Sequence, residues 1–208
     1  MSQQERILKE AADMFLDEGI KSVRMDDIAV RLGVSKRTLY EMFSDKSDLL
    51  EQSLGHYFIR KRGEMEARTR DAANIFEEIF LILAAMKSDE RRGVLIGNLK
   101  KFYPEIHRRI EEEAHKFSDR EFDRLLDRGI QQGLLLPDMN KDLAMVTLTY
   151  TMTALFDQKH RLRRHDGVSL QMTFEYVIVN FFRGLSTHKG IEIIDEIVKK
   201  YRIAQTRK

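Results

Sequence analysis

The chain has 208 residues, of which 42% are hydrophobic and 34% charged, with 11 glycines and 2 prolines. This length and composition allow a sizeable core and favour long helices with charged outer faces over a turn-rich β fold, which indicates an all-α protein. Because cysteine is absent, disulfides, thiolate metal sites and a cysteine nucleophile are excluded, and a reducing compartment fits.

The N-terminal residues MSQQERILKEAADMF are charged and amphipathic, without the apolar run of a secretory signal. The longest uncharged stretch, Leu143 to Phe156, has 14 residues and is too short to cross a bilayer. We therefore expect a cytoplasmic protein with no membrane partner.

The net charge of the chain is +2, and residues 1–50 carry 8 Lys and Arg against 10 Asp and Glu. Bulk charge thus gives no argument for a nucleic-acid partner. Any such argument must rest on where particular side chains point.

Three short helices are predicted at the start of the chain. The first ends at Gly19 and has apolar residues at three- and four-residue intervals: Ile7, Leu8, Ala11, Ala12, Phe15 and Leu16. The segment MDDIAVRL follows as a second helix, with Asp26 and Asp27 at the positive end of its dipole. Gly33 permits a tight turn, and Ser35 is a good N-cap for a third helix that runs to about Phe43.

A long fourth helix is predicted from about residue 45 to residue 70, with Ser44 as its cap. Pro104 resembles a first helical position, and GLLLPDMN marks a break between helices. Further helices are expected at roughly 73–87, 90–101, 104–132 with a break left open, 140–163, 168–187 and 190–203.

The stretches LAMVTLTYTMTALF and MTFEYVIVNFFRGL are apolar almost all the way round. Helices of this kind must be covered on several sides. They therefore suit the interface of a symmetric helix-bundle dimer, while two central core helices of a monomer remain the alternative.

The third helix has an apolar face and an outer polar face. At about 100° per residue, Leu39, Met42 and Phe43 gather on one side, which leaves Arg37, Thr38, Tyr40 and Glu41 outside it. Together with the second helix and the Gly33 turn, this is the pattern of a helix-turn-helix, whose second helix enters the major groove.

The N-terminal residues of the third helix lie nearest the bases in such a complex. Ser35, Lys36, Arg37 and Thr38 occupy that end, and Arg37 is suited to guanine. Lys36 suits a base or a phosphate, and Thr38 a phosphate or a thymine methyl group. Tyr40 is placed to give its hydroxyl to the DNA backbone. Lys46 adds a positive charge where helix amides favour a phosphate.

The run from Ile7 to Leu50, with DDIAVRLGVSKRTLYEMFSDKSDLL at its centre, resembles the N-terminal DNA-binding domain of the TetR/AcrR family of transcriptional regulators. The matching elements are Phe15, Gly19, Asp27-Ile28-Ala29, Gly33-Val34-Ser35, Thr38-Leu39-Tyr40, Phe43 and Lys46. This resemblance covers about a quarter of the chain, and its strength lies in the joint spacing.

The resemblance implies a helix-turn-helix DNA-binding domain over residues 1–45 and a helical regulatory and dimerisation domain over residues 46–208. It further implies a homodimer that binds palindromic operator DNA, usually as a repressor, and a pocket for a small effector among the central helices. The later part of the chain is similar only in the order and character of its helices, so the resemblance transfers no ligand.

One position departs from the family pattern. The family often has a serine or threonine before the second helix that caps it and touches phosphate, whereas this chain has Val23-Arg24. The Arg24 side chain cannot cap a helix, but it can reach a phosphate as a charged substitute. The alternative is a solvated arginine at the rim.

A pocket is expected among the helices that span about 54 to 135. Ten methionines and the aromatic residues suggest an adaptable apolar interior, although methionine at helical spacing is usually core. The candidate lining residues for a small, largely apolar effector are Phe58, Phe76, Phe80, Phe102 and Phe117.

An enzymatic function is not expected. Glu112-x-x-His115 and Asp157-x-x-His160 are similar to the Glu-x-x-His motif of carboxylate-bridged di-iron centres. The second sequence has aspartate in place of glutamate, and both lie among charged residues. We therefore predict no metal and no cofactor. A helical-bundle enzyme with a carboxylate and histidine metal site, and a helical binding module without DNA function, are the competing hypotheses.

Overall fold

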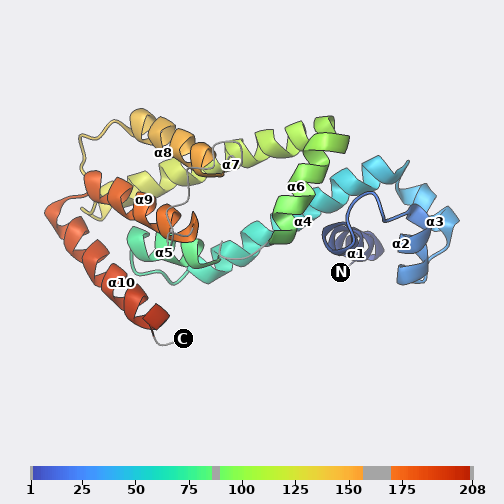
Figure 1. Cartoon of the computed structure of the whole chain (residues 1–208), viewed down its shortest axis with the longest axis horizontal. Helices are drawn as coiled ribbons and strands as arrows, with labels where there is room; N and C mark the ends of the chain where they lie inside the picture. Colours follow the sequence, from blue (N-terminus) through green and yellow to red (C-terminus); the bar gives the residue numbers. More distant parts are fainter. Residues whose placement is uncertain (1, 86–89, 157–169, 207–208) are drawn as a thin grey trace. The chain divides into compact units, whose positions relative to one another are not determined.

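The computed structural model describes residues 2–85, 90–156 and 170–206. The described residues form helices and one isolated bridge between Leu135 and Ser186, with no strand among them, which confirms the all-α prediction. The helices are α1 (Gln3–Asp17), α2 (Met25–Leu32), α3 (Lys36–Met42), α4 (Lys46–Thr69), α5 (Ile75–Ala85), α6 (Glu90–Phe102), α7 (Pro104–Gln131), α8 (Lys141–Phe156), α9 (Leu170–Gly184) and α10 (His188–Thr206) (Figure 1).

The predicted helices are found in the expected order, with differences at their ends. The break left open in the seventh helix does not occur, because α7 is one helix from Pro104 to Gln131. The ninth helix ends at Gly184, earlier than predicted, and α10 begins at His188. The end predicted for the eighth helix, residue 163, lies outside the described residues.

The chain divides into two compact units. The first runs to Arg70 and includes Ser88–His115, so it contains α1 to α4, α6 and the first part of α7. The second consists of Asp71–Lys87 and the chain from Lys116 onward, with α5, the rest of α7, and α8 to α10. This division describes packing, and the functional boundary between residues 45 and 46 stays a prediction.

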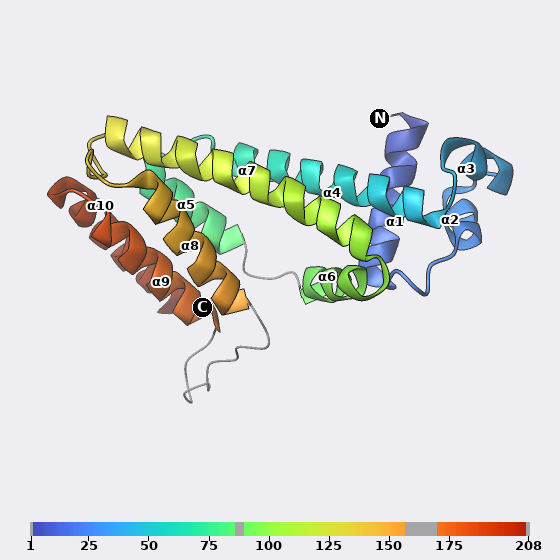
Figure 2. The ribbon, with the colours of Figure 1, turned by 90° about the horizontal axis from the view of Figure 1, so that it is seen from above.

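In the first unit, α1 packs against α2, α4 and α6. Figure 2 shows α1 lying across the first part of α4, beside α2 and α3. Leu95 and Leu99 of α6 are buried in the same core, so the helix-turn-helix and α6 share one apolar cluster. The largest fully buried side chains of this core are Ile7, Phe15, Ile20, Ile28, Leu39, Phe43, Leu49, Leu50, Leu54 and Leu95.

In the second unit, α10 packs against α5 and α9, and α8 packs against α9 (Figure 1). The last helix thus packs on the second unit, where Ile194 is buried in the core. A buried carboxylate, Glu78 of α5, accepts a 2.6 Å hydrogen bond from Arg128 of α7. Because an unpaired buried charge is costly, this pair ties the two helices together.

Two loops of the second unit are joined by backbone hydrogen bonds. The N–H of Leu136 donates to the carbonyl of Leu185 at 2.9 Å, and the N–H of Thr187 donates to the carbonyl of Leu134 at 3.0 Å. These bonds fix the connection between α7 and α8 against the connection between α9 and α10.

Within the described parts of the chain, no helix is both long enough and apolar enough to span a membrane.

Candidate DNA-binding surface

The turn between α2 and α3 is closed by backbone hydrogen bonds. Gly33 has φ 66°, in the left-handed region where glycine carries no side-chain penalty. The N–H of Val34 donates to the carbonyl of Ala29 at 3.0 Å, and the N–H of Gly33 donates to that of Val30 at 3.1 Å. This pair of bonds satisfies the last carbonyls of α2 and fixes the direction in which the chain leaves it.

A side chain from α1 also supports the end of α2. Arg6 donates from Nη2 to the carbonyl of Leu32 at 3.1 Å. The sequence reasoning missed this contact, because nothing in the local pattern indicates which side chain reaches a helix end from another helix.

Ser35 caps α3 as predicted. Its Oγ accepts a hydrogen bond from the N–H of Thr38 at 3.0 Å and lies 2.8 Å from Oγ1 of Thr38. The cap satisfies one of the free amides of the first turn. It also brings the Thr38 hydroxyl close to the Ser35 hydroxyl at the N-terminal end of α3.

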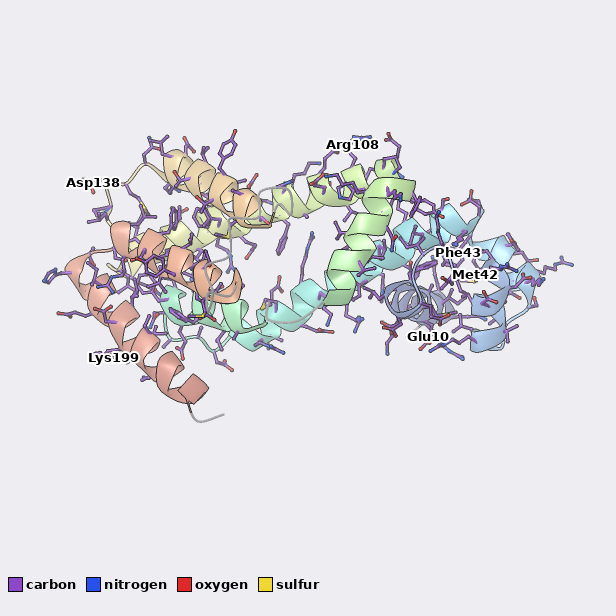
Figure 3. All side chains as sticks on the ribbon, viewed as in Figure 1. Glu10, Met42, Phe43, Arg108, Asp138 and Lys199 are labelled. Atoms are coloured by element: carbon purple, nitrogen blue, oxygen red, sulfur yellow. The ribbon has the colours of Figure 1, made fainter. Side chains whose placement is uncertain are left out.

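The inner face of α3 is anchored as the helical period predicts. Leu39 and Phe43 are fully buried, and Met42 is partly buried against the same core. Figure 3 shows Met42 and Phe43 where α3 ends, within the small N-terminal bundle. Since these residues hold the helix from behind, the opposite face is left for a partner.

The outer face of α3 carries exposed polar groups. The Arg37 side chain is 88% exposed and that of Lys36 is 63% exposed, while Tyr40 is also exposed and Thr38 is half-buried. Arg37 donates from Nε to Glu41 at 2.7 Å, and Lys36 forms an ion pair with Asp26 of α2. The structure therefore brings Ser35, Lys36, Arg37, Thr38 and Tyr40 together on one short helix.

Arg24 stands at the N-cap position of α2 and is exposed. Its backbone N–H donates to the Asp27 carboxylate at 2.8 Å, which is the half of a capping box that an arginine permits. The Arg24 side chain takes no part in this cap. Its proposed phosphate contact therefore stays a prediction.

Lys46 lies in the first turn of α4, partly buried. Burial lowers its pKa below the ordinary lysine value, and the nearby Asp27 carboxylate opposes this shift. Lys46 thus connects the start of α4 electrostatically with the start of α2.

The cap of α4 differs from the prediction. Asp45, and not Ser44, is the N-cap residue, and its Oδ1 accepts from the N–H of Asp48 at 2.9 Å. Asp48 in turn accepts from the N–H of Ser44 at 2.9 Å. Both Ser44 and Asp45 are good caps, and the backbone path decides between them.

The five phenylalanines predicted to line a pocket belong to different units. Phe58 and Phe102 lie in the first unit, where Phe58 makes an edge contact with Tyr57 and the ammonium of Lys21 lies 3.6 Å from the Phe102 ring centroid. Phe76, Phe80 and Phe117 lie in the second unit. The pocket stays a prediction.

The second unit contains an aromatic cluster that the sequence reasoning missed. Phe182 makes an edge contact with Phe76 at a centroid distance of 6.3 Å, lies 6.3 Å from Phe122, and makes an edge contact with Phe181 at 5.3 Å. The adjacent phenylalanines in an apolar helix are the sequence signal that points to it.

The described residues include no group of three or more metal-ligating side chains that could hold an ion. Glu112, Glu113 and His115 are exposed on α7. The second part of the imitated motif, Asp157 to His160, lies outside the described residues.

In α3, buried residues anchor one face, the N-terminus is capped and the other face carries exposed cations. This pattern is typical of all-α DNA-binding proteins of the helix-turn-helix class. Residues 7–52 match the family model of the bacterial regulatory proteins of the tetR family.

Two relatives are similar over longer segments. The HTH-type transcriptional repressor KstR2 of Mycolicibacterium smegmatis is 24% identical over 151 residues, which cover 68% of this chain and 72% of that protein. An uncharacterized HTH-type transcriptional regulator of Bacillus subtilis, YvaF, is 30% identical over 101 residues, covering 47% of this chain and 53% of that one.

The fold is also that of solved structures in this class. A putative transcriptional regulator from Saccharomonospora viridis, solved in complex with choline, matches with a TM-score of 0.66 at 19% identity, over 89% of this chain and 98% of that chain. Residues 7–52 thus match the DNA-binding domain of the tetR family, and over longer segments the chain is similar to HTH-type transcriptional regulators.

Proposed function

We propose that this protein is a cytoplasmic repressor that binds a palindromic operator as a homodimer and is released by a small, largely apolar effector. Residues 1–45 form the DNA-binding domain in this proposal, and residues 46–208 sense the effector and dimerise. The observation that carries it is the exposed N-terminal half of α3, which buried Leu39 and Phe43 support from behind.

In the proposed complex, the first turn of α3 faces the base edges in the major groove. Arg37 reads guanine, and Ser35, Lys36 and Thr38 contact bases or phosphates around it. Arg24, Tyr40 and Lys46 contact the DNA backbone. Since the two recognition helices of a dimer enter successive major grooves, the half-sites are separated by about 34–36 Å.

The outward faces of α8 and α9 support the homodimer. Tyr150 of α8 is 75% exposed and Tyr176 of α9 is 71% exposed. Further exposed apolar residues on these two helices are Leu143 and Val146 of α8 and Met172 of α9. An apolar surface on two adjacent helices is typical of a protein interface. A second copy of the chain with the same faces would cover it and form a four-helix interface.

The apolar interior of the second unit supports an apolar effector. Aromatic rings gather there around Phe182, and Met139 and Met152 are partly buried against the same core. Methionine side chains adapt their shape to a ligand more readily than branched ones. An effector that binds one conformation better than the other lowers operator affinity by its differential affinity.

Selection of bound duplexes from genomic fragments, followed by anisotropy titrations at several salt concentrations, tests this function. Replacing Arg37 by Ala should weaken binding to the selected operator by about 10- to 100-fold and relax its sequence preference. Replacing Lys36 by Ala should weaken binding to all duplexes. It should also reduce the salt slope, which is the steepness with which the logarithm of the binding constant falls with the logarithm of the salt concentration, by about one.

Arg108 offers a matched control. Like Arg37, it is an exposed arginine that donates to a glutamate four residues later, here Glu112 at 2.7 Å. We expect Arg108→Ala to leave DNA binding unchanged. If the wild-type protein bound no duplex DNA at low ionic strength, the proposed function would be wrong.

A further inference from the structure

Two cations on the outer face of α3 are already paired with carboxylates in the protein without DNA. Lys36 pairs with Asp26 from the first turn of α2, and Arg37 pairs with Glu41 one turn further along α3. All four side chains are more than half exposed. The charges of Lys36 and Arg37, two of the cations proposed to contact DNA, are therefore opposed by acids of the same surface.

Asp26 and Glu41 differ from the neighbouring Asp27 because they have no role in capping a helix. The Asp27 carboxylate accepts the N–H of Arg24 and completes the cap of α2, so its removal would disturb the fold. Among the described residues, the Asp26 and Glu41 carboxylates pair with the cations alone and accept from no backbone amide. Their charge can therefore be removed without breaking a hydrogen bond that caps a helix.

A carboxylate beside a basic side chain acts against DNA binding in two ways. Lys36 and Arg37 must give up Asp26 and Glu41 before a phosphate or a base takes their place. A carboxylate left near the duplex also repels the phosphates, so fewer counterions are released on binding.

We infer that Asp26 and Glu41 set the DNA affinity of this protein, because each holds a DNA-contacting cation in the free state and competes with DNA for it. This inference rests on the proposed contacts of Lys36 and Arg37. Asp26 limits affinity for any duplex through Lys36. Glu41 limits affinity for the operator and its sequence preference through Arg37.

The expected size of the effect follows from the strength of exposed ion pairs. Removing one such competitor and its repulsion of phosphate raises the affinity about threefold to tenfold. It also makes the salt slope steeper by about one for each subunit.

The experiment compares the wild type with Asp26→Asn and Glu41→Gln in anisotropy titrations at several salt concentrations. The probes are a mixed-sequence duplex and an operator fragment obtained by genomic selection. Glu112→Gln is the matched control, because it breaks the same kind of Arg–Glu pair, with Arg108, on α7. Circular dichroism melting verifies that each variant is folded.

We expect Asp26→Asn to bind both probes more tightly, and most of this gain to vanish when Lys36 is also replaced by Ala, because only the direct repulsion of phosphate then remains. Glu41→Gln should bind the operator more tightly and lose most of the gain in an Arg37→Ala background. A gain of equal size in Glu112→Gln, or one that persists undiminished without the paired cation, would show a general charge effect and overturn the inference.

Folded variants with unchanged or weaker binding would also overturn the inference while leaving DNA binding itself in place. A wild type that binds neither probe at low ionic strength would instead remove the proposed function and this inference together.

Discussion

At the scale of single residues, the structural role of Ser35 and its proposed role in DNA binding can be tested separately. Its Oγ caps α3 through the N–H of Thr38. We expect Ser35→Ala to lower the free energy of unfolding by about 1 kcal/mol, measured by urea denaturation, and to weaken DNA binding.

Ser35→Asp distinguishes the two roles. Aspartate is also a good cap, so stability should stay close to that of the wild type. Its charge, at the end of α3 that is proposed to face the groove, would be repelled by phosphate, so DNA binding should fall more than for Ser35→Ala. Equal binding by the aspartate variant and the wild type would contradict the proposed position of Ser35.

Gly190 in the first turn of α10 lies against backbone of the α7–α8 connection. A Cβ at this position would collide with the carbonyl oxygen of Leu134 and press on Ser186. We expect Gly190→Ala to destabilise the protein by about 1–3 kcal/mol in urea denaturation, because backbone cannot move aside cheaply.

Gly184, at the end of α9, is the control within the same unit. A Cβ there meets no atom within 4 Å. Gly184→Ala should therefore leave stability unchanged or raise it by a few tenths of a kcal/mol, at most about 1 kcal/mol. A loss as large as that of Gly190→Ala would show that the collision is not the cause.

At the scale of elements, the start of α4 depends on ionised Asp48. Hydrogen bonds from the Gln52 side chain and the Ser44 backbone lower the pKa of Asp48 below its ordinary value. A carboxyl group with a lowered pKa in the folded state stabilises the protein above its unfolded pKa of about 4, and this contribution is lost as the pH falls through the folded pKa.

Asp48→Ala should therefore destabilise the protein at pH 7 and have a smaller effect as the pH falls below about 4. Urea denaturation of both proteins across this pH range measures the difference. Glu66→Gln, on the exposed side of the same helix, serves as the control. A cost for Asp48→Ala that is the same at acid and neutral pH would contradict the account.

At the scale of the whole molecule, the proposed homodimer is the feature on which the proposed operator binding depends. A charge at both Tyr150 and Tyr176, on the exposed faces of α8 and α9, would have to be buried without a partner in the proposed interface. We expect the double variant Tyr150→Glu/Tyr176→Glu to sediment as a monomer in analytical ultracentrifugation and to bind the operator at least about tenfold more weakly, since the second half-site no longer contributes.

Ile59→Glu is the control, because Ile59 is an exposed apolar residue on α4 in the first unit. It should leave the sedimentation unchanged. A double variant that stays dimeric would assign the interface to another surface.

The helix-turn-helix was predictable in detail because its determinants are local. Spacing alone placed Leu39 and Phe43 inside, and residue type alone placed Gly33 in the turn and Ser35 at the cap. The cap of α4 was assigned wrongly to Ser44, since two neighbouring residues were equally suited to the position and only the path of the backbone distinguishes them.

By itself, the sequence determined the all-α class, the order of the helices and which face of α3 is polar, because helical period, caps and turn residues act over a few residues. Only the tertiary structure decided that Lys36 meets Asp26, that Arg6 supports the end of α2, and that Phe76 packs on Phe182. Such contacts join residues from different helices, and their partners follow from how the helices pack, which no local pattern contains.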